Sequence, residues 1–282
     1  MTEHILQEVI TRERFDHEHN CITVTELQWM VRKVKRYSAM YTMILLALDT
    51  GMRCNELLRL TLHHLNGFSS LNYAVSKAKK TTDGNTTIVD RKHRVVKLSE
   101  FAGQELKAYC DIHFIVVQTK DGPRYVSPYR DLEAGPDGKV LAQKLFNWKN
   151  TACFDAAWWK LRKAMVKAGF DADRLESLST WHLRHKRAPS YVVRFHKLRH
   201  MALTIFWYRN GRDIKAAQKW IKHERGQTTD GYVHPASDLG VTEIELTTLT
   251  LSELLGMGRC QLSLTNAMPP EQTLLDMFQI AS

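Results

Sequence analysis

Apolar side chains recur at helical spacing over much of this chain. After Thr25-Glu26, apolar residues follow at Leu27, Met30, Val31 and Val34, which is the i, i+3, i+4, i+7 pattern of an amphipathic helix. Glycines or an Asn-Gly pair stop several such runs, as expected at helix ends. Further helices are predicted over Ala39–Leu48, Asn55–Leu62, residues 101–113, Ala152–Ala168, Met201–Tyr208 and Asp213–Ile221.

The helical spacing of apolar residues gives way to short strand-forming runs between residues 73 and 98. Short runs at Ala74–Ser76, Thr86–Val89 and Val95–Leu98 favour β-strands, and Thr82-Asp83-Gly84-Asn85 is a turn signal among them. We therefore predict a mainly α protein with one small antiparallel β-sheet, an α+β fold. Residues 118–140 are rich in Gly and Pro and predict a long loop. Residues 171–195 follow no clear pattern and are interpreted as an insertion.

Charge is abundant and uneven. The 282 residues carry a formal net charge of +10 and a pI near 9.4. Lys186–Arg225 holds eleven Lys and Arg residues against two acidic ones, whereas residues 238–282 hold one Arg against six acidic ones. A basic body of this kind indicates a polyanionic partner, either nucleic acid or an anionic membrane surface. The alternative is a solvated basic face.

The cysteines and the N-terminus indicate a cellular compartment. Five cysteines are widely spread without a CxxC pair, which favours a reducing environment. No basic segment followed by an apolar stretch opens the sequence, and the most apolar run, Tyr41–Leu48, is too short to span a bilayer. We expect a soluble, cytoplasmic protein. Residues 16–21 hold possible metal ligands, but without a second ligand cluster we predict no metal site.

Candidate chemistry lies in two separated segments. His196-Lys197-Leu198-Arg199-His200 is followed 24 residues past Arg199 by His223, and Tyr232 lies nine residues beyond. Far upstream stands Thr50–Leu57, which contains Arg53 and Glu56. Guanidinium forks hold phosphate oxygens, imidazoles move protons, and a phenol can act as a nucleophile. Together these groups could attack a phosphodiester.

Each of these residues also has a simpler interpretation. Arg53 and Glu56 could form an ion pair at a helix start, which also fits a catalytic arginine oriented by a carboxylate. His196 could cap a helix, and His200 is better explained by packing than by proton transfer. The similar His182-Leu183-Arg184-His185 has the wrong His-to-Arg spacing and lies too far from His223.

These segments, taken in order, resemble the tyrosine recombinase (phage integrase) family. Thr50-Gly51-Met52-Arg53-Cys54-Asn55-Glu56-Leu57 resembles its first arginine box, His196-x-x-Arg199-His200 its second, and His223 with Tyr232 its third. The resemblance extends from about Cys21 to Pro235. It implies a catalytic domain over residues 22–237, a short N-terminal segment at 1–21, and an acidic tail at 238–282.

The resemblance also implies roles for the residues. Tyr232 would attack DNA and form a 3′-phosphotyrosine without a cofactor, while Arg53 and Arg199 hold the phosphate. His196 would assist as base or phosphate ligand and His223 as hydrogen-bond donor, supported by Glu56 and His200. Lys77 is the preferred general acid, with Lys79 and Lys80 as alternatives. Other basic residues expected to contact DNA are Lys79, Lys80, Arg194, Lys197 and Arg225.

The implied partners are double-stranded DNA, a homotetramer on two synapsed sites and, in some systems, accessory DNA-bending proteins. Three features depart from the family pattern. Little chain precedes the pattern, so most of the N-terminal DNA clamp would be missing, and Lys222 stands directly before His223 where the family usually has glycine. The tail is also long, with a possible intersubunit docking helix at Glu271–Ile280. Alternative functions are a type IB topoisomerase-like or telomere-resolving strand transferase and a non-catalytic DNA-binding protein.

Overall fold

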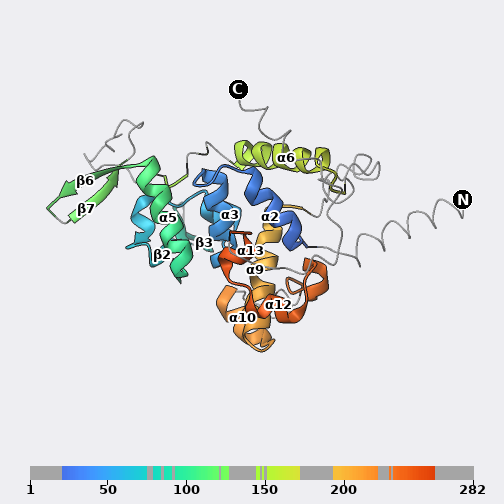
Figure 1. Ribbon diagram of the computed structural model, residues 1–282. Coiled ribbons are helices and arrows are strands. Elements are labelled where there is room, and N and C mark those ends of the chain that lie inside the picture. The colour runs from blue at the N-terminus through green and yellow to red at the C-terminus, as the bar shows by residue number, and fades with distance from the viewer. Residues whose placement is uncertain are drawn as a thin grey trace, which may run out of the picture.

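The computed structural model is mainly helical with small antiparallel sheets (Figure 1), which confirms the predicted fold class. The structure describes residues 21–74, 79–83, 86–90, 93–120, 122–126, 144–146, 148, 151–171, 193–221, 229 and 231–257. Within this part of the chain, no helix is both long and apolar enough to cross a membrane.

Two helices that pack against each other lie at the centre of the fold. Helix α3 (Ala39–Thr50) is apolar almost all round and buried over most of its length, and it packs against α9 (His196–Arg209). The Ser38 side chain caps the start of α3, and Gly51 ends it at φ +64°, a left-handed conformation that glycine adopts without strain. The predicted helix over Ala39–Leu48 is thus confirmed, and α9 extends the predicted Met201–Tyr208 helix back to His196.

Other helices surround this pair (Figure 1). Helix α2 (Val24–Lys33) starts at Thr23, whose side chain and that of Glu26 form a reciprocal capping box. Helix α6 (Thr151–Lys167) packs on α2, α5 (Glu100–His113) packs on α3, and α10 (Ile214–Ile221) packs on α9. One face of α6, which includes Phe154, Trp158 and Met165, is buried.

Three separate sheets are described where one was predicted. Strand β2 (Ser70–Ala74) pairs with both β1 (Leu65–Asn66) and β5 (His93–Lys97), and Tyr73 lies opposite Arg94. Strands β3 (Lys79–Asp83) and β4 (Thr86–Asp90) form a hairpin around the predicted turn. The first predicted strand, Ala74–Ser76, was placed too far toward the C-terminus. The observed strand β2 begins at Ser70 and ends at Ala74.

A third hairpin occupies the start of the predicted loop. Strand β6 (Ile115–Thr119) begins two residues after the end of α5 and pairs with β7 (Gly122–Val126), so the prediction of a structureless loop from residue 118 was wrong there. The hairpin extends away from the helical body (Figure 1). Residues 127–140 of that predicted loop lie outside the described residues.

The predicted helix over Asn55–Leu62 was too long. Helix α4 ends after one turn, at Cys54–Leu57, and a 3₁₀ turn follows at Leu62–His64. Between them, the Leu145 amide donates to the carbonyl of Leu60 (2.8 Å), and Thr61 bridges to Lys144. A distant segment therefore pairs with this stretch of backbone and prevents it from continuing as a helix.

The beginning of the acidic tail packs on the helical body. A 3₁₀ helix at Ala236–Leu239 is followed by α12 (Glu243–Thr248) and α13 (Leu251–Leu254). Leu239 and Leu246 are fully buried in the main core. The possible docking helix at Glu271–Ile280 and the N-terminal segment 1–20 lie outside the described residues, and so does most of the proposed insertion at 171–195.

Candidate functional site

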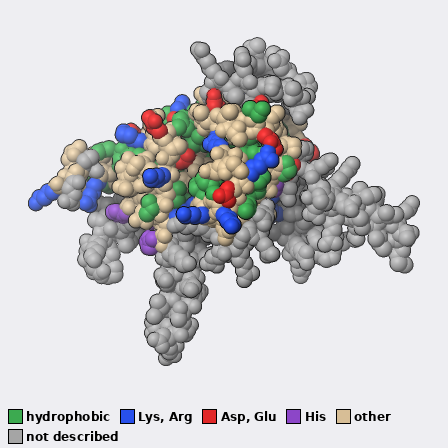
Figure 2. Space-filling model, turned by 90° about the horizontal axis from the view of Figure 1, so that it is seen from below, with side chains coloured by type: hydrophobic (Ala, Val, Ile, Leu, Met, Phe, Trp, Pro, Cys, Tyr) green, Lys and Arg blue, Asp and Glu red, His purple; other side chains and the backbone are tan. Residues whose placement is uncertain are grey.

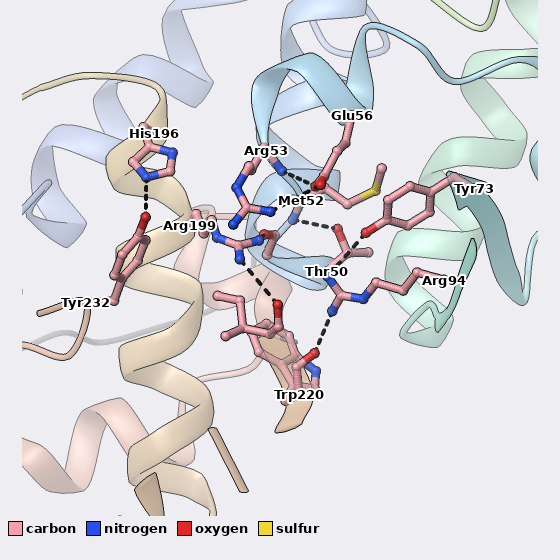
Figure 3. Close-up of polar contacts among 12 residues, drawn as sticks. Thr50, Met52, Arg53, Glu56, Tyr73, Arg94, His196, Arg199, Trp220 and Tyr232 are labelled. Atoms are coloured by element: carbon pink, nitrogen blue, oxygen red, sulfur yellow. Dashed lines mark hydrogen bonds and ion pairs between the residues drawn. The ribbon is translucent and has the colours of Figure 1, made fainter. Parts of the chain in front are cut away.

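A tight turn between α3 and α4 presents Arg53. The Thr50 hydroxyl donates to the carbonyl of Leu46 (2.5 Å) and accepts from the Met52 amide (3.3 Å), which closes the turn after α3. Arg53 then stands at the N-cap of α4 in extended conformation. Its side chain, 28% exposed, points into the space between α4 and α9 (Figure 3).

Glu56 holds Arg53 through both its backbone amide and its guanidinium group. One carboxylate oxygen accepts from the Arg53 backbone amide (2.8 Å) and the other from the guanidinium Nη1 (3.2 Å). The Glu56 side chain is only 1% exposed, so this ion pair is shielded from solvent on the carboxylate side. The ion pair foreseen from the sequence is confirmed, and it orients Arg53 without covering it.

Arg199 lies deeper than Arg53. It is 1% exposed, and its two Nη atoms donate to the carbonyls of Gly51 and Ile221, the latter at 3.3 Å. Burial, together with the neighbouring Arg53, lowers the pKa of Arg199 to about 10, while Glu56 acts in the opposite direction. Arg199 therefore remains charged at neutral pH. It joins the end of α3 to the end of α10.

His196 and Tyr232 meet on the side of Arg199 that faces away from Arg53. The His196 Nε2 lies 2.9 Å from the Tyr232 hydroxyl, and the Arg199 guanidinium carbon lies 6.0 Å from the centre of the Tyr232 ring (Figure 3). Phe195, just before the helix, packs edge-on against Phe154 at 4.9 Å and Trp158 at 5.3 Å. This aromatic contact with α6 fixes the start of α9 and hence the place of His196.

The electrostatic surroundings of His196 keep its imidazole neutral. Burial, followed by the positive charges of Arg199 and Arg53, lowers its pKa to about 4. A neutral imidazole has one ring nitrogen able to accept a hydrogen bond, which a protonated ring lacks. The contact with Tyr232 therefore allows His196 to accept the phenol proton.

A second histidine supports the tyrosine ring. His200 is buried and stacks on Tyr232 with centroids 4.1 Å apart at 18°, while its Nδ1 lies 3.0 Å from Nε2 of His234. His234 in turn lies 3.5 Å from an Asp238 oxygen. Burial is the main cause that lowers the pKa of His200, to about 2. The expectation that His200 serves packing agrees with this stacking.

The backbone around Tyr232 is held as well. Its amide donates to the Thr229 carbonyl (2.9 Å), and the Thr204 hydroxyl accepts from the His234 amide (3.2 Å). Thr204 lies on α9, so the helix that carries His196, Arg199 and His200 also holds the tyrosine segment. None of Thr204, His234 and Asp238 was selected from the sequence, because isolated Thr, His and Asp residues give no signal there.

The structure brings six predicted residues together and leaves others undecided. Arg53, Glu56, His196, Arg199 and Tyr232 form one cluster (Figure 3), and His200 stacks on Tyr232. In contrast, Lys77, His223 and Arg225 lie outside the described residues, and for Lys79 and Lys80 only the backbone of β3 is described. Their roles stay predictions.

Two of the expected DNA contacts lie near the start of α9. Arg194 and Lys197 are both half-buried. Burial lowers the pKa of Lys197, and the lysine lies near the buried Cys21. Lys197 is therefore partly used in packing.

Sequence reasoning missed the buried Arg94. Arg94 in β5 is 4% exposed and donates to the Tyr73 hydroxyl (3.2 Å) and to the carbonyl of Trp220 (2.6 Å). Residues 94 and 96 are the two inward positions of this strand. An arginine in the alternating pattern was the available signal, but the predicted strand began at Val95 and excluded it.

The basic excess of the sequence is not gathered into one patch on the face drawn in Figure 2. There, Lys and Arg side chains alternate with Asp and Glu over the described surface, and further basic side chains mark the end formed by the β6–β7 hairpin. In the described residues, no group of three or more His, Cys, Asp or Glu residues could hold a metal ion.

Comparisons with known proteins identify the family of the chain. The family model described as "Phage integrase family" matches residues 21–238. Similar solved structures include XerA recombinase, at 21% identity and TM-score 0.46 over 79% of this chain and 61% of that one. The Tn1549 transposon integrase in complex with circular intermediate DNA has 17% identity and TM-score 0.43 over 74% and 60% of the two chains.

A third solved structure is the catalytic domain of bacteriophage HP1 integrase, with 15% identity and TM-score 0.39 over 74% of this chain and 82% of that one. The chain spans about 60% of the length of the XerA and Tn1549 chains. A comparison with curated proteins gave no match. Because the family match covers well over half of the sequence and includes every residue of the cluster, the chain belongs to the phage integrase family.

Proposed function

We propose that this chain is a site-specific DNA recombinase that cleaves and rejoins DNA through a 3′-phosphotyrosine. The observation that carries the proposal is the Tyr232 hydroxyl, which lies 2.9 Å from a neutral imidazole, while the Arg199 guanidinium carbon lies 6.0 Å from the centre of the same ring. Membership of the phage integrase family supports it. The reaction needs a nucleophile, a proton acceptor and fixed positive charge, and this cluster has all three.

In the proposed cleavage step, the Tyr232 oxygen attacks the scissile phosphorus and gives its proton to His196. The P–O5′ bond breaks, and Lys77 donates a proton to the leaving 5′-oxygen. Arg53 and Arg199 stabilise the charge that builds up on the non-bridging oxygens, and His223 donates a hydrogen bond to one of them. Each such fixed donor is typically worth about 10²- to 10³-fold in rate.

Strand exchange then reverses this chemistry with another DNA end. The 5′-hydroxyl of a second strand attacks the phosphotyrosine and releases Tyr232, so the bond energy is conserved without a nucleotide cofactor. The proposed partners are double-stranded DNA and three further copies of this chain on two synapsed sites, together with accessory DNA-bending proteins. Inversion, resolution and integration are alternative outcomes of this same chemistry.

The test uses a supercoiled plasmid that carries two copies of the DNA flanking the gene. Full-length protein should form a covalent protein–DNA adduct and rearranged plasmid. Tyr232→Phe should abolish the adduct while DNA binding, measured by gel shift, stays within about twofold. Tyr125→Phe is the matched control, because that phenol lies on the β6–β7 hairpin and donates to Asp111 instead. It should behave as wild type.

Each outcome separates one function from another. Relaxed plasmid without rearrangement would favour a topoisomerase-like strand transferase, and a gel shift without any adduct would favour a DNA-binding protein that does no chemistry. An adduct that persists in Tyr232→Phe would remove Tyr232 from its proposed role. Arg53→Lys and Arg199→Lys keep the charge but lose the guanidinium fork, so both should slow adduct formation.

A further inference from the structure

Two buried guanidinium groups hold the C-terminal end of α10. Arg94 Nη2 donates to the carbonyl of Trp220 at 2.6 Å, and Arg199 Nη2 donates to the carbonyl of Ile221 at 3.3 Å. These are the last two residues of the helix, whose terminal carbonyls lack partners within the helix. Cations are favoured there because the carbonyl end of a helix carries partial negative charge.

Arg94 reaches this helix end from the sheet. It lies opposite Tyr73 across the β2–β5 ladder, and the Tyr73 hydroxyl accepts from its Nη1 at 3.2 Å. Arg94 is only 4% exposed, so a charge is buried at some cost. Its acceptors are 21 and 126 residues distant in the sequence, so the side chain connects two separate parts of the fold.

The Trp220 side chain adds packing to these hydrogen bonds. Its ring stacks on Phe206 of α9, with centroids 4.7 Å apart at 12°. It also covers Gly51, where a Cβ atom would come within 3.0 Å of the indole. The end of α10 is thus packed against the turn that carries Arg53, and Arg199 donates to the carbonyl of that same Gly51.

We propose that Arg94 is a positioning residue of the recombinase site. Together with Arg199 it fixes the last turn of α10, whose Trp220 packs on the Gly51 turn that presents Arg53. The consequence for catalysis rests on the proposed function, whereas the clamp on α10 does not. Arg94 itself needs no contact with DNA in this role, since its two Nη atoms donate to protein oxygens.

The clamp is tested first without DNA, by amide hydrogen exchange of the full-length protein. Arg94→Met keeps an unbranched side chain but removes the donors, and Lys97→Met makes the same change of charge at an exposed position of the same strand. Loss of a charge-assisted hydrogen bond should speed exchange in α10 at least about tenfold. Exchange in α2 should stay unchanged, and Lys97→Met should match wild type. Equal α10 exchange in wild type and Arg94→Met would overturn the clamp.

The consequence for chemistry is tested by a double-mutant cycle on single-turnover adduct formation. Arg94→Met should slow the reaction roughly tenfold in the wild-type background but less than about twofold in Arg53→Ala, because the clamp then has no Arg53 side chain left to position. Equal slowing in both backgrounds would overturn the positioning role. If wild type itself forms no adduct, the proposed function fails while the exchange experiment still decides the clamp. Arg94→Lys, which keeps one donor and the charge, replaces Arg94→Met if that variant does not fold.

Discussion

Replacing Glu56 with Gln is the sharpest test of how the site is held together. The carboxylate is 1% exposed and accepts from both the amide and the guanidinium of Arg53. It also supports the charge of Arg199, whose pKa it raises against the effects of burial and Arg53. Gln has the same shape and retains one acceptor oxygen, so the substitution removes the negative charge with little change in packing.

The expected loss of stability follows from the burial of the pair. Breaking a buried ion pair by neutralising one partner costs roughly 3–5 kcal/mol. Arg53 is 28% exposed and can recover part of its hydration, so we expect about 1–3 kcal/mol here. Under the proposed mechanism, adduct formation should fall as well, by roughly tenfold or more, because an untethered Arg53 is no longer oriented toward the phosphate.

Equilibrium urea unfolding measures the stability term, and the chain offers a matched control. Glu245 caps α12 in the same way, accepting from the Thr242 amide at 2.8 Å, and its capping box involves no arginine. Glu245→Gln therefore loses a cap charge but no buried ion pair, and should cost less than about 1 kcal/mol. If Glu56→Gln costs no more than Glu245→Gln, the reasoning about the buried pair is refuted.

Two further predictions concern stability. Gly51→Ala should lower the free energy of unfolding in urea by about 2–3 kcal/mol, because it combines a positive φ with a Cβ 3.0 Å from Trp220. Gly67→Ala is the control: its φ is also positive but the space around it is open, so it should cost only about 1 kcal/mol. Equal losses in the two variants would contradict the packing argument. The folded-state pKa values of His196 and His200 lie below the ordinary value of about 6.5, so in acid the unfolded chain binds more protons than the folded one. Stability should therefore fall as the pH drops below 6.5. The loss should continue to about pH 4 for His196 and to a lower pH for His200. The slope is at most about 1.4 kcal/mol per pH unit per histidine, and unfolding from pH 7 to 5 should be less pH-dependent in His200→Gln than in wild type; identical slopes would contradict it.

The helices could be predicted from the sequence because their periodicity is local. The apolar run at Ala39–Leu48 and the glycine after it specify α3 and its end, and the helix predicted over Ala152–Ala168 corresponds to α6 within one residue at each end. Errors occurred where a distant segment intervenes. Helix α4 is short because residues 144–145 pair with the backbone at Leu60–Thr61, an interaction that no local pattern encodes.

The candidate site shows the same division. The order and spacing of Arg53, His196, Arg199 and Tyr232 allowed their selection, and the structure brings them together. The residues that hold them in place could not be selected. Arg94 lies in an ordinary strand, and its donation to Trp220 becomes visible only when β5 and α10 are adjacent in space.

The two arginines proposed to hold the phosphate, Arg53 and Arg199, differ in what they can offer it. Arg53 is part-exposed at a helix start, and its Nη1 is paired with a single carboxylate, so its guanidinium can still meet a ligand from the solvent side. Arg199 is 1% exposed, and each Nη already donates to a backbone carbonyl. A buried cation in such fixed surroundings acts mainly through its electrostatic potential, which is stronger where water is excluded. Two of its five N–H donors hold the carbonyls of Gly51 and Ile221, so under the proposed mechanism the packing of α10 sets the position of this charge.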